Sequence, residues 1–123
     1  ARHGEEHPEA GAAVEVIVER CRRALTPGAV VLLHGVGVGP ASFARVATLL
    51  GDRHRVVCLE RPVGPGGMAL PVDQQADLLA EHVRALGEGG VLVVGVSGGA
   101  TVGLALAIRH PSEVRAMVLH EPL

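Results

Sequence analysis

The stretch LVVGVSGGAT, residues 92–101, joins an apolar run to a glycine-rich turn. Its apolar part predicts a buried strand over residues 91–94, and the almost wholly apolar residues 98–110 predict a helix buried on most sides. Ser97 therefore lies at a sharp strand-to-helix turn, within the pattern G-x-S-x-G. Glycines at positions 95 and 99 suit this turn, because side chains there would collide with the neighbouring strand and helix.

Two interpretations of Ser97 are compatible with this position. A serine at the start of a helix often caps the first turn with its hydroxyl oxygen, which would make Ser97 purely structural. Alternatively, the turn lifts the hydroxyl clear of the sheet at the positive end of the helix, where developing negative charge is stabilised. The pentapeptide alone does not decide between a helix cap and a nucleophile.

Strands and helices alternate along the rest of the chain. Hydrophobic periodicity predicts further strands at residues 29–33, 55–60 and 116–119, and further helices at 42–50 and 72–86. This order predicts an α/β fold, a parallel sheet with helices on both faces. Ligands bind such sheets beyond the carboxyl ends of the strands, where the strand order reverses.

The first 28 residues are less regular. Residues 1–11 have no periodicity and are expected to form a flexible tail. Residues 12–28 are expected to form an N-terminal element and a linker; 12–25 fit both helical spacing and strand alternation, with a slight preference for helix. The main fold then occupies residues 29–123.

Composition excludes several classes of protein. Phe43 is the one aromatic residue and the net charge is -2, so a nucleic-acid-binding surface is not expected. No apolar run approaches the length of a membrane span. Two cysteines, Cys21 and Cys58, are too few for a disulfide framework and favour a reducing, cytoplasmic location. The hydrophobic fraction of 48% suggests more apolar surface than one small core can bury.

A second glycine-rich turn follows the first predicted strand, in the segment HGVGVG, residues 34–39. Its main-chain N–H groups are predicted to face Ser97 and, with the N–H of Gly98, to form an oxyanion hole. A dinucleotide site is the alternative, with Glu60 as the ribose-binding acid. The G-x-G-x-x-G spacing from Gly35 fails, however, because position 40 is proline.

Two blocks of the sequence resemble the α/β-hydrolase family. Residues 30–62, VVLLHGVGVGPASFARVATLLGDRHRVVCLERP, look like that family's oxyanion strand, loop, first helix and next strand. Residues 91–122, VLVVGVSGGATVGLALAIRHPSEVRAMVLHEP, look like its nucleophile elbow, the following helix and the next strand. Both blocks occur in the right order and structural context, so the resemblance covers residues 29–123.

The resemblance implies specific site residues. Ser97 would be the nucleophile, with the main-chain N–H groups of Val36 and Gly98 as oxyanion donors. Glu121, directly after the last predicted strand, is a candidate acid. Neither a metal nor an organic cofactor is implied. The residues that would support the loop and the turn are His34, Gly35, Gly95 and Gly99.

The chain departs from the family in lacking a clear general base. His54, His82 and His110 are predicted at the wrong end of the sheet or within a helix facing it. His120 is predicted at the correct, carboxyl end of its strand, but the family's histidine follows a later strand, so His120 is only a stand-in for it. A serine without its base is a poor nucleophile. In addition, Glu60 stands where the family usually has aspartate.

These features predict an incomplete α/β-hydrolase fold, its N-terminal half, ending near the point where a cap domain is commonly inserted. A second polypeptide or C-terminal fragment would supply the acid, the histidine and the remaining strands. The expected function is a serine hydrolase that cleaves an ester, thioester, lactone or similar acyl bond of a small molecule through an acyl-enzyme. The rival interpretation is a non-catalytic α/β-hydrolase-like binding or regulatory module.

Overall fold

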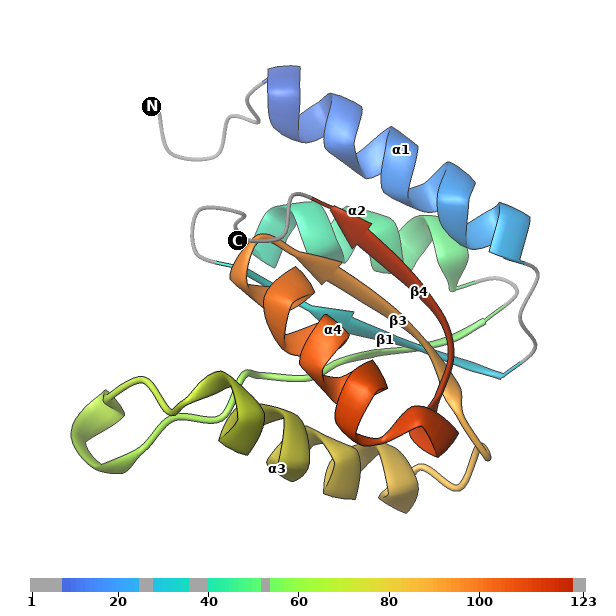
Figure 1. Cartoon of the computed structure of the whole chain (residues 1–123). Helices are drawn as coiled ribbons and strands as arrows, with labels where there is room; N and C mark the ends of the chain where they lie inside the picture. The colour runs from blue at the N-terminus through green and yellow to red at the C-terminus, as the bar shows by residue number, and fades with distance from the viewer. Residues whose placement is uncertain (1–7, 25–27, 36–39, 52–53, 121–123) are drawn as a thin grey trace.

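The computed structural model describes residues 8–24, 28–35, 40–51 and 54–120. The described strands form one parallel sheet in the order β2–β1–β3–β4 (Figure 1). Their bounds are β1 (Ala29–Leu33), β2 (Arg55–Cys58), β3 (Val91–Val96) and β4 (Val114–His120). The predicted parallel sheet is therefore confirmed, although β2 ends two residues early and β4 is longer at both ends.

Helices cover both faces of the sheet (Figure 1). The helices are α1 (Pro8–Ala24), α2 (Pro40–Leu50), α3 (Val72–Ala85) and α4 (Gly98–Arg109), with short 3₁₀ turns η1 (Pro65–Gly67) and η2 (Pro111–Glu113). One core lies between the sheet and α1 with α2, and the other between the sheet and α3 with α4. None of the helices described here is long and apolar enough to cross a membrane.

The central strands are buried on both faces, as their continuous apolar sequences predict. Every residue of β1 and β3 is buried. In β1, Val30 and Leu32 contribute to the core beneath α1 and α2, whereas Val31 and Leu33 contribute to the core beneath α3 and α4. Successive side chains of a strand point to opposite faces of the sheet, so the apolar residues of β1 pack against both helical layers.

The N-terminal element is a helix, and it begins earlier than expected. α1 starts at Pro8, so residues 8–11 are helical and the flexible-tail prediction is wrong for them; residues 1–7 lie outside the described part. Proline is tolerated at the first helical position because its missing N–H would have no intrahelical partner. Burial of Val14, Ile17, Val18 and Cys21 at helical spacing also resolves the helix-or-strand ambiguity.

Both cysteines are free thiols. Cys21 is buried within the α1 core, and this burial raises its thiol pKa to about 11. The protonated thiol therefore packs as a small apolar group.

The chain reverses its direction of travel across the sheet at β1. From β1 it passes to β2 at one edge, then returns to β3 on the other side of β1. The loops that follow β1 and β3 consequently leave adjacent carboxyl ends in opposite directions, which creates the switch point where parallel sheets bind ligands.

Ionic contacts join α3 to the carboxyl end of α4. Arg109 donates from Nε and Nη2 to the two carboxylate oxygens of Asp77, both at 2.8 Å, and His110 Nε2 lies 2.7 Å from Asp77 Oδ1. These hydrogen bonds from Arg109 and His110 hold the pKa of the Asp77 carboxyl well below its ordinary value. The ionised carboxylate is therefore the form that links the two helices.

We predict that Asp77→Asn lowers the thermal midpoint of unfolding above about pH 4. A carboxyl group whose pKa is depressed by folding adds stability above its unfolded pKa, and this contribution is lost as pH falls through the folded pKa. The gap between wild type and variant should consequently shrink on acidification. Differential scanning calorimetry between pH 2 and pH 7 measures this gap.

Asp73→Asn is the matched control, because Asp73 is 70% exposed and lies 3.6 Å from Arg109 Nη1 without the paired hydrogen bonds of Asp77. Its effect should be smaller. A gap between wild type and Asp77→Asn that widens on acidification would contradict the linkage.

Candidate active site

Ser97 occupies a strained backbone conformation between β3 and α4. Its φ of 56° and ψ of -120° make it the one non-glycine residue with positive φ in the described part of the chain. Such a conformation costs about 1–3 kcal/mol and persists only where surrounding structure enforces it. The sharp strand-to-helix turn predicted from G-x-S-x-G is therefore observed.

The Ser97 side chain does not cap α4, so the helix-cap interpretation is wrong. No capping hydrogen bond reaches its hydroxyl, and its dihedral angles differ from the extended ones of ordinary N-caps. The backbone holds the turn instead: Ser97 N–H donates to the His120 carbonyl (2.9 Å), and the Ser97 carbonyl accepts from Ala100 (3.0 Å) and Thr101 (3.2 Å). The partly exposed side chain is thus not used to start the helix.

Gly95 and Gly99 allow β1, β3 and α4 to converge. A Cβ at Gly95 would lie 2.5 Å from the Gly99 carbonyl oxygen and 2.7 Å from the Ala100 Cα. A Cβ at Gly99 would collide with the carbonyl group of Leu33 and would lie 2.8 Å from the His34 carbonyl oxygen. All of these neighbours are backbone atoms, so no side-chain rotation could make room.

Gly35, shortly after the end of β1, lies directly against the Ser97 turn. A Cβ at Gly35 would collide with the Val96 carbonyl oxygen, lie 2.7 Å from the Ser97 Cβ and lie 3.1 Å from the Gly98 nitrogen. Gly35 is buried and His34 is partly buried beside it. The structure therefore brings His34, Gly35, Ser97 and Gly98 together, whereas the second predicted oxyanion donor, Val36, lies outside the described residues.

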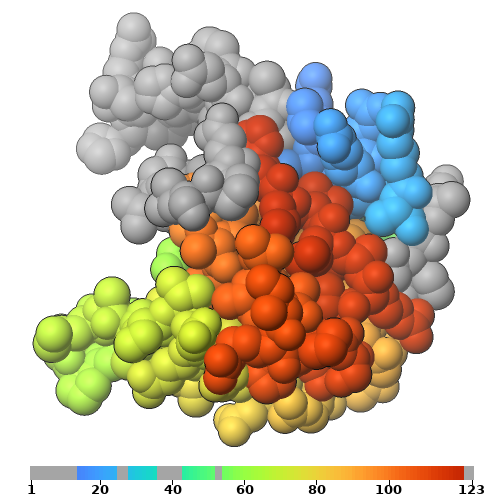
Figure 2. All heavy atoms as spheres, in the orientation of Figure 1, coloured from blue at the N-terminus to red at the C-terminus, as the bar shows by residue number. Residues whose placement is uncertain are grey.

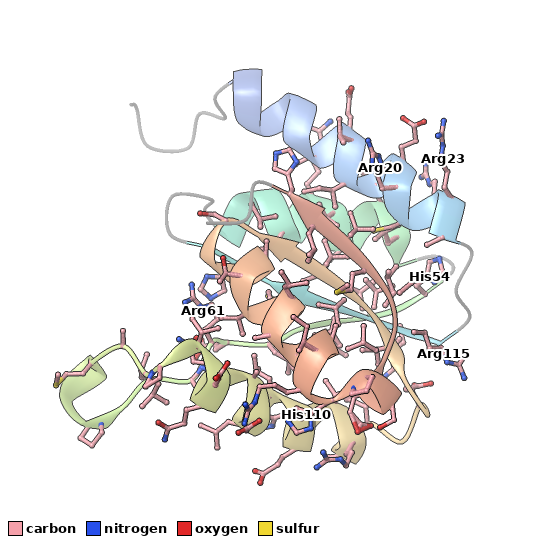
Figure 3. The ribbon with its side chains drawn as sticks, viewed as in Figure 1. Arg20, Arg23, His54, Arg61, His110 and Arg115 are labelled. Carbon is pink, nitrogen blue, oxygen red and sulfur yellow. The ribbon has the colours of Figure 1, made fainter. Side chains whose placement is uncertain are left out.

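Arg61, which was not among the residues predicted for the site, places a cation beside the start of α4. The Arg61 guanidinium fills the space where Gly98 would carry a side chain, with Nη1 2.6 Å from the ideal Cβ position. Figure 3 shows Arg61 near the beginning of α4, on the opposite side of the molecule from Arg115 and His54. Two sequence signals could have indicated it: an arginine shortly after β2 at the carboxyl edge, and a glycine directly after the serine.

Four of the described histidines, His54, His82, His110 and His120, do not supply an obvious base. His110 is bound to Asp77 and partly buried, His82 is exposed on α3, and His54 precedes β2 at the amino end of the sheet. His120 ends β4 at the carboxyl edge of the sheet and lines a groove against α1, and its backbone carbonyl, not its imidazole, accepts from Ser97 N–H. Glu121, the candidate acid, lies outside the described residues.

Comparison with known proteins identifies the family. The α/β-hydrolase fold family model matches residues 28–123, and this chain belongs to that family. The observed sheet order and the Ser97 turn agree with this assignment, which disfavours the dinucleotide-binding interpretation.

Individual relatives give the same class. The chain is 39% identical over 93 residues to pimeloyl-[acyl-carrier protein] methyl ester esterase of Chromobacterium violaceum, covering 73% of this chain and 35% of the relative. It is 38% identical over 98 residues to 2-hydroxy-6-oxo-2,4-heptadienoate hydrolase of Pseudomonas putida, covering 73% and 36%. This chain thus spans about a third of the length of these curated relatives.

Solved structures agree at the level of the fold. A probable hydrolytic enzyme from Pseudomonas aeruginosa superposes with a TM-score of 0.70 at 24% identity, covering 80% of this chain and 33% of that one. An α/β hydrolase from a lagoon-sediment metagenome gives 0.65 at 24% identity, covering 76% and 44%. Both likenesses define the fold alone.

We predict that Gly99→Ala destabilises the protein by about 1–3 kcal/mol, because its Cβ would press on backbone atoms of Leu33 and His34. Chemical denaturation measures the change. Gly103→Ala is the control in the same helix, since its Cβ would meet only side-chain atoms, the nearest being Val93 Cγ1 at 3.1 Å. Equal stability of the two variants would show that the convergence at Gly99 tolerates a side chain.

Proposed function

We propose that this chain is the nucleophile-bearing part of a serine hydrolase, which cleaves an ester, thioester, lactone or similar acyl bond of a small molecule. The observation that carries the proposal is the strained Ser97 turn at the switch point, whose side chain takes no part in capping α4. The printed names of relatives, a methyl ester esterase and a hydrolase, support the reaction class.

In the proposed reaction, Ser97 Oγ attacks the substrate carbonyl carbon while a base accepts its proton. The carbonyl oxygen becomes negatively charged, and the N–H groups of Gly98 and Val36 donate to it. Collapse of this intermediate expels the alcohol or thiol, which receives the proton, and leaves an acyl-enzyme on Ser97. Water then attacks the acyl-enzyme, releases the acid and restores the serine.

We further propose that additional polypeptide supplies the catalytic acid, the histidine and strands beyond β4. The β4 strand is at the edge of the described sheet, and its surface faces the viewer between α1 and α4 (Figure 2). Beside it is a groove of about 250 Å³, lined by α1 residues Val16, Ile17, Arg20 and Ala24 and by β4 residues 117–120. An edge strand with partly exposed apolar side chains such as Met117 is suited to pair with another strand.

The proposed compartment is the reducing cytoplasm. Two free cysteines, one of them exposed, support this proposal because oxidising compartments favour disulfides. When the protein is isolated in the presence of an alkylating reagent, both cysteines should be recovered as alkylated thiols and not as disulfides.

Ser97→Ala is predicted to abolish covalent labelling of the native assembly by a fluorophosphonate probe and to lower kcat for p-nitrophenyl butyrate by about 10⁴–10⁶-fold. The reason is that only an activated serine reacts with the probe. Intact-mass spectrometry and peptide mapping locate the adduct. Ser112→Ala, at an exposed serine preceding β4, is the control and should label like wild type.

Absence of labelling at Ser97 in a folded native assembly would instead support the non-catalytic binding module. Labelling that persists in Ser97→Ala would assign the nucleophile to another residue. Either result would contradict the proposed function.

A further inference from the structure

Arg61 lies against the start of α4, beside the residue that directly follows Ser97. It follows the carboxyl end of β2 by three residues, and its guanidinium fills the space left by the absent side chain of Gly98, the residue directly after Ser97. Three guanidinium atoms, Nη1, Cζ and Nη2, lie 2.6, 3.4 and 3.6 Å from the ideal Gly98 Cβ position. In the proposed function, a substituent that extends from the reacting carbonyl over Gly98 would approach this group.

A neutral and buried side chain holds Arg61 in place. Its Nε donates to Gln75 Oε1 at 3.1 Å, and Gln75 Nε2 donates to the Leu70 carbonyl at 2.8 Å. Gln75 is 3% exposed, so its orientation is fixed by packing as well as by hydrogen bonds. The arrangement uses Nε for support and leaves Nη1 as the guanidinium atom nearest to Gly98.

The printed side-chain partner of Arg61 is a neutral amide, whereas four other described arginines pair with carboxylates. Arg23, Arg55, Arg84 and Arg109 each pair with a carboxylate, at 2.8–3.1 Å. Among the described residues Arg61 instead has an amide partner. A cation beside the positive end of α4 is electrostatically unfavourable unless an anion joins it.

We propose that Arg61 is a specificity-determining residue that binds an anionic oxygen group, a carboxylate or phosphate, on the substrate next to the reacting acyl bond. The planar guanidinium presents paired N–H groups that match both kinds of oxyanion. This inference rests on the proposed function for its location, and it defines the substrate class as acyl compounds with a nearby negative charge. Gln75 is the positioning residue that orients the guanidinium.

The test measures binding of two matched esters to the native assembly carrying Ser97→Ala, which prevents turnover. Monomethyl succinate is the anionic ligand and dimethyl succinate the neutral one, and isothermal titration calorimetry gives both dissociation constants. The anionic ester should bind about 10-fold to 100-fold tighter, and adding Arg61→Gln should remove this preference. Arg23→Gln, which removes an exposed arginine charge on α1, should retain it.

Gln75→Glu provides a second variant should Arg61→Gln fail to fold. It places a carboxylate beside Nε, neutralises the guanidinium locally and should also reduce the preference for the anionic ester. Equal binding of the two esters by the parent, or an unchanged preference in a folded Arg61→Gln or Gln75→Glu variant, would overturn the proposal. An equal loss of binding for both esters would also overturn it, because it would assign Arg61 a general structural role.

Titration of methyl phosphate in place of monomethyl succinate shows whether Arg61 binds a phosphate or a carboxylate more tightly. Fluorophosphonate labelling of the wild-type assembly tests Ser97 independently. If the proposed function is wrong, Ser97 is not labelled but the preference for the anionic ester remains. If the role of Arg61 is wrong, Ser97 is labelled but the anionic ester is not preferred.

Discussion

The close approach of three backbone segments is the constraint on which the rest of the site depends. The end of β1, the Ser97 turn and the first turn of α4 are so near one another that a Cβ at Gly35, Gly95 or Gly99 would touch backbone atoms of a neighbouring segment. Because these three residues are glycines, α4 can pack directly against the sheet at the switch point. The strain at Ser97 is maintained by this packing, because the turn has no room to relax.

Much of this arrangement could be predicted from the sequence, because it depends on local patterns. The apolar runs of β1 and β3 predict strands buried on both faces, and glycine at 95 and 99 predicts the sharp turn. The start of α1 was harder, since a proline at position 8 suits both a tail and the first residue of a helix. Whether the proline begins a helix depends on whether the following turns of α1 pack against the core, which the local sequence does not show.

Arg61 could not be predicted in the same way, because its position depends on contacts between distant segments. Its support comes from Gln75 and Leu70, and the space that it fills is created by Gly98, which is 37 residues away in sequence. The sequence places Arg61 only in a loop after β2. Which volume its flexible side chain occupies is decided by which neighbouring residue lacks a side chain.

The turn also depends on β4, which links the candidate nucleophile to the edge of the sheet. Ser97 N–H donates to the carbonyl of His120, the last residue of β4, and β4 pairs along its length with β3. A strand added on the other side of β4 would bond to the alternate residues of β4 and would restrain the His120 carbonyl only by holding β4 itself in place. If the proposed additional polypeptide extends the sheet, this backbone hydrogen bond would couple the added strand to the orientation of Ser97, so that polypeptide would affect the site through its geometry as well as through its residues.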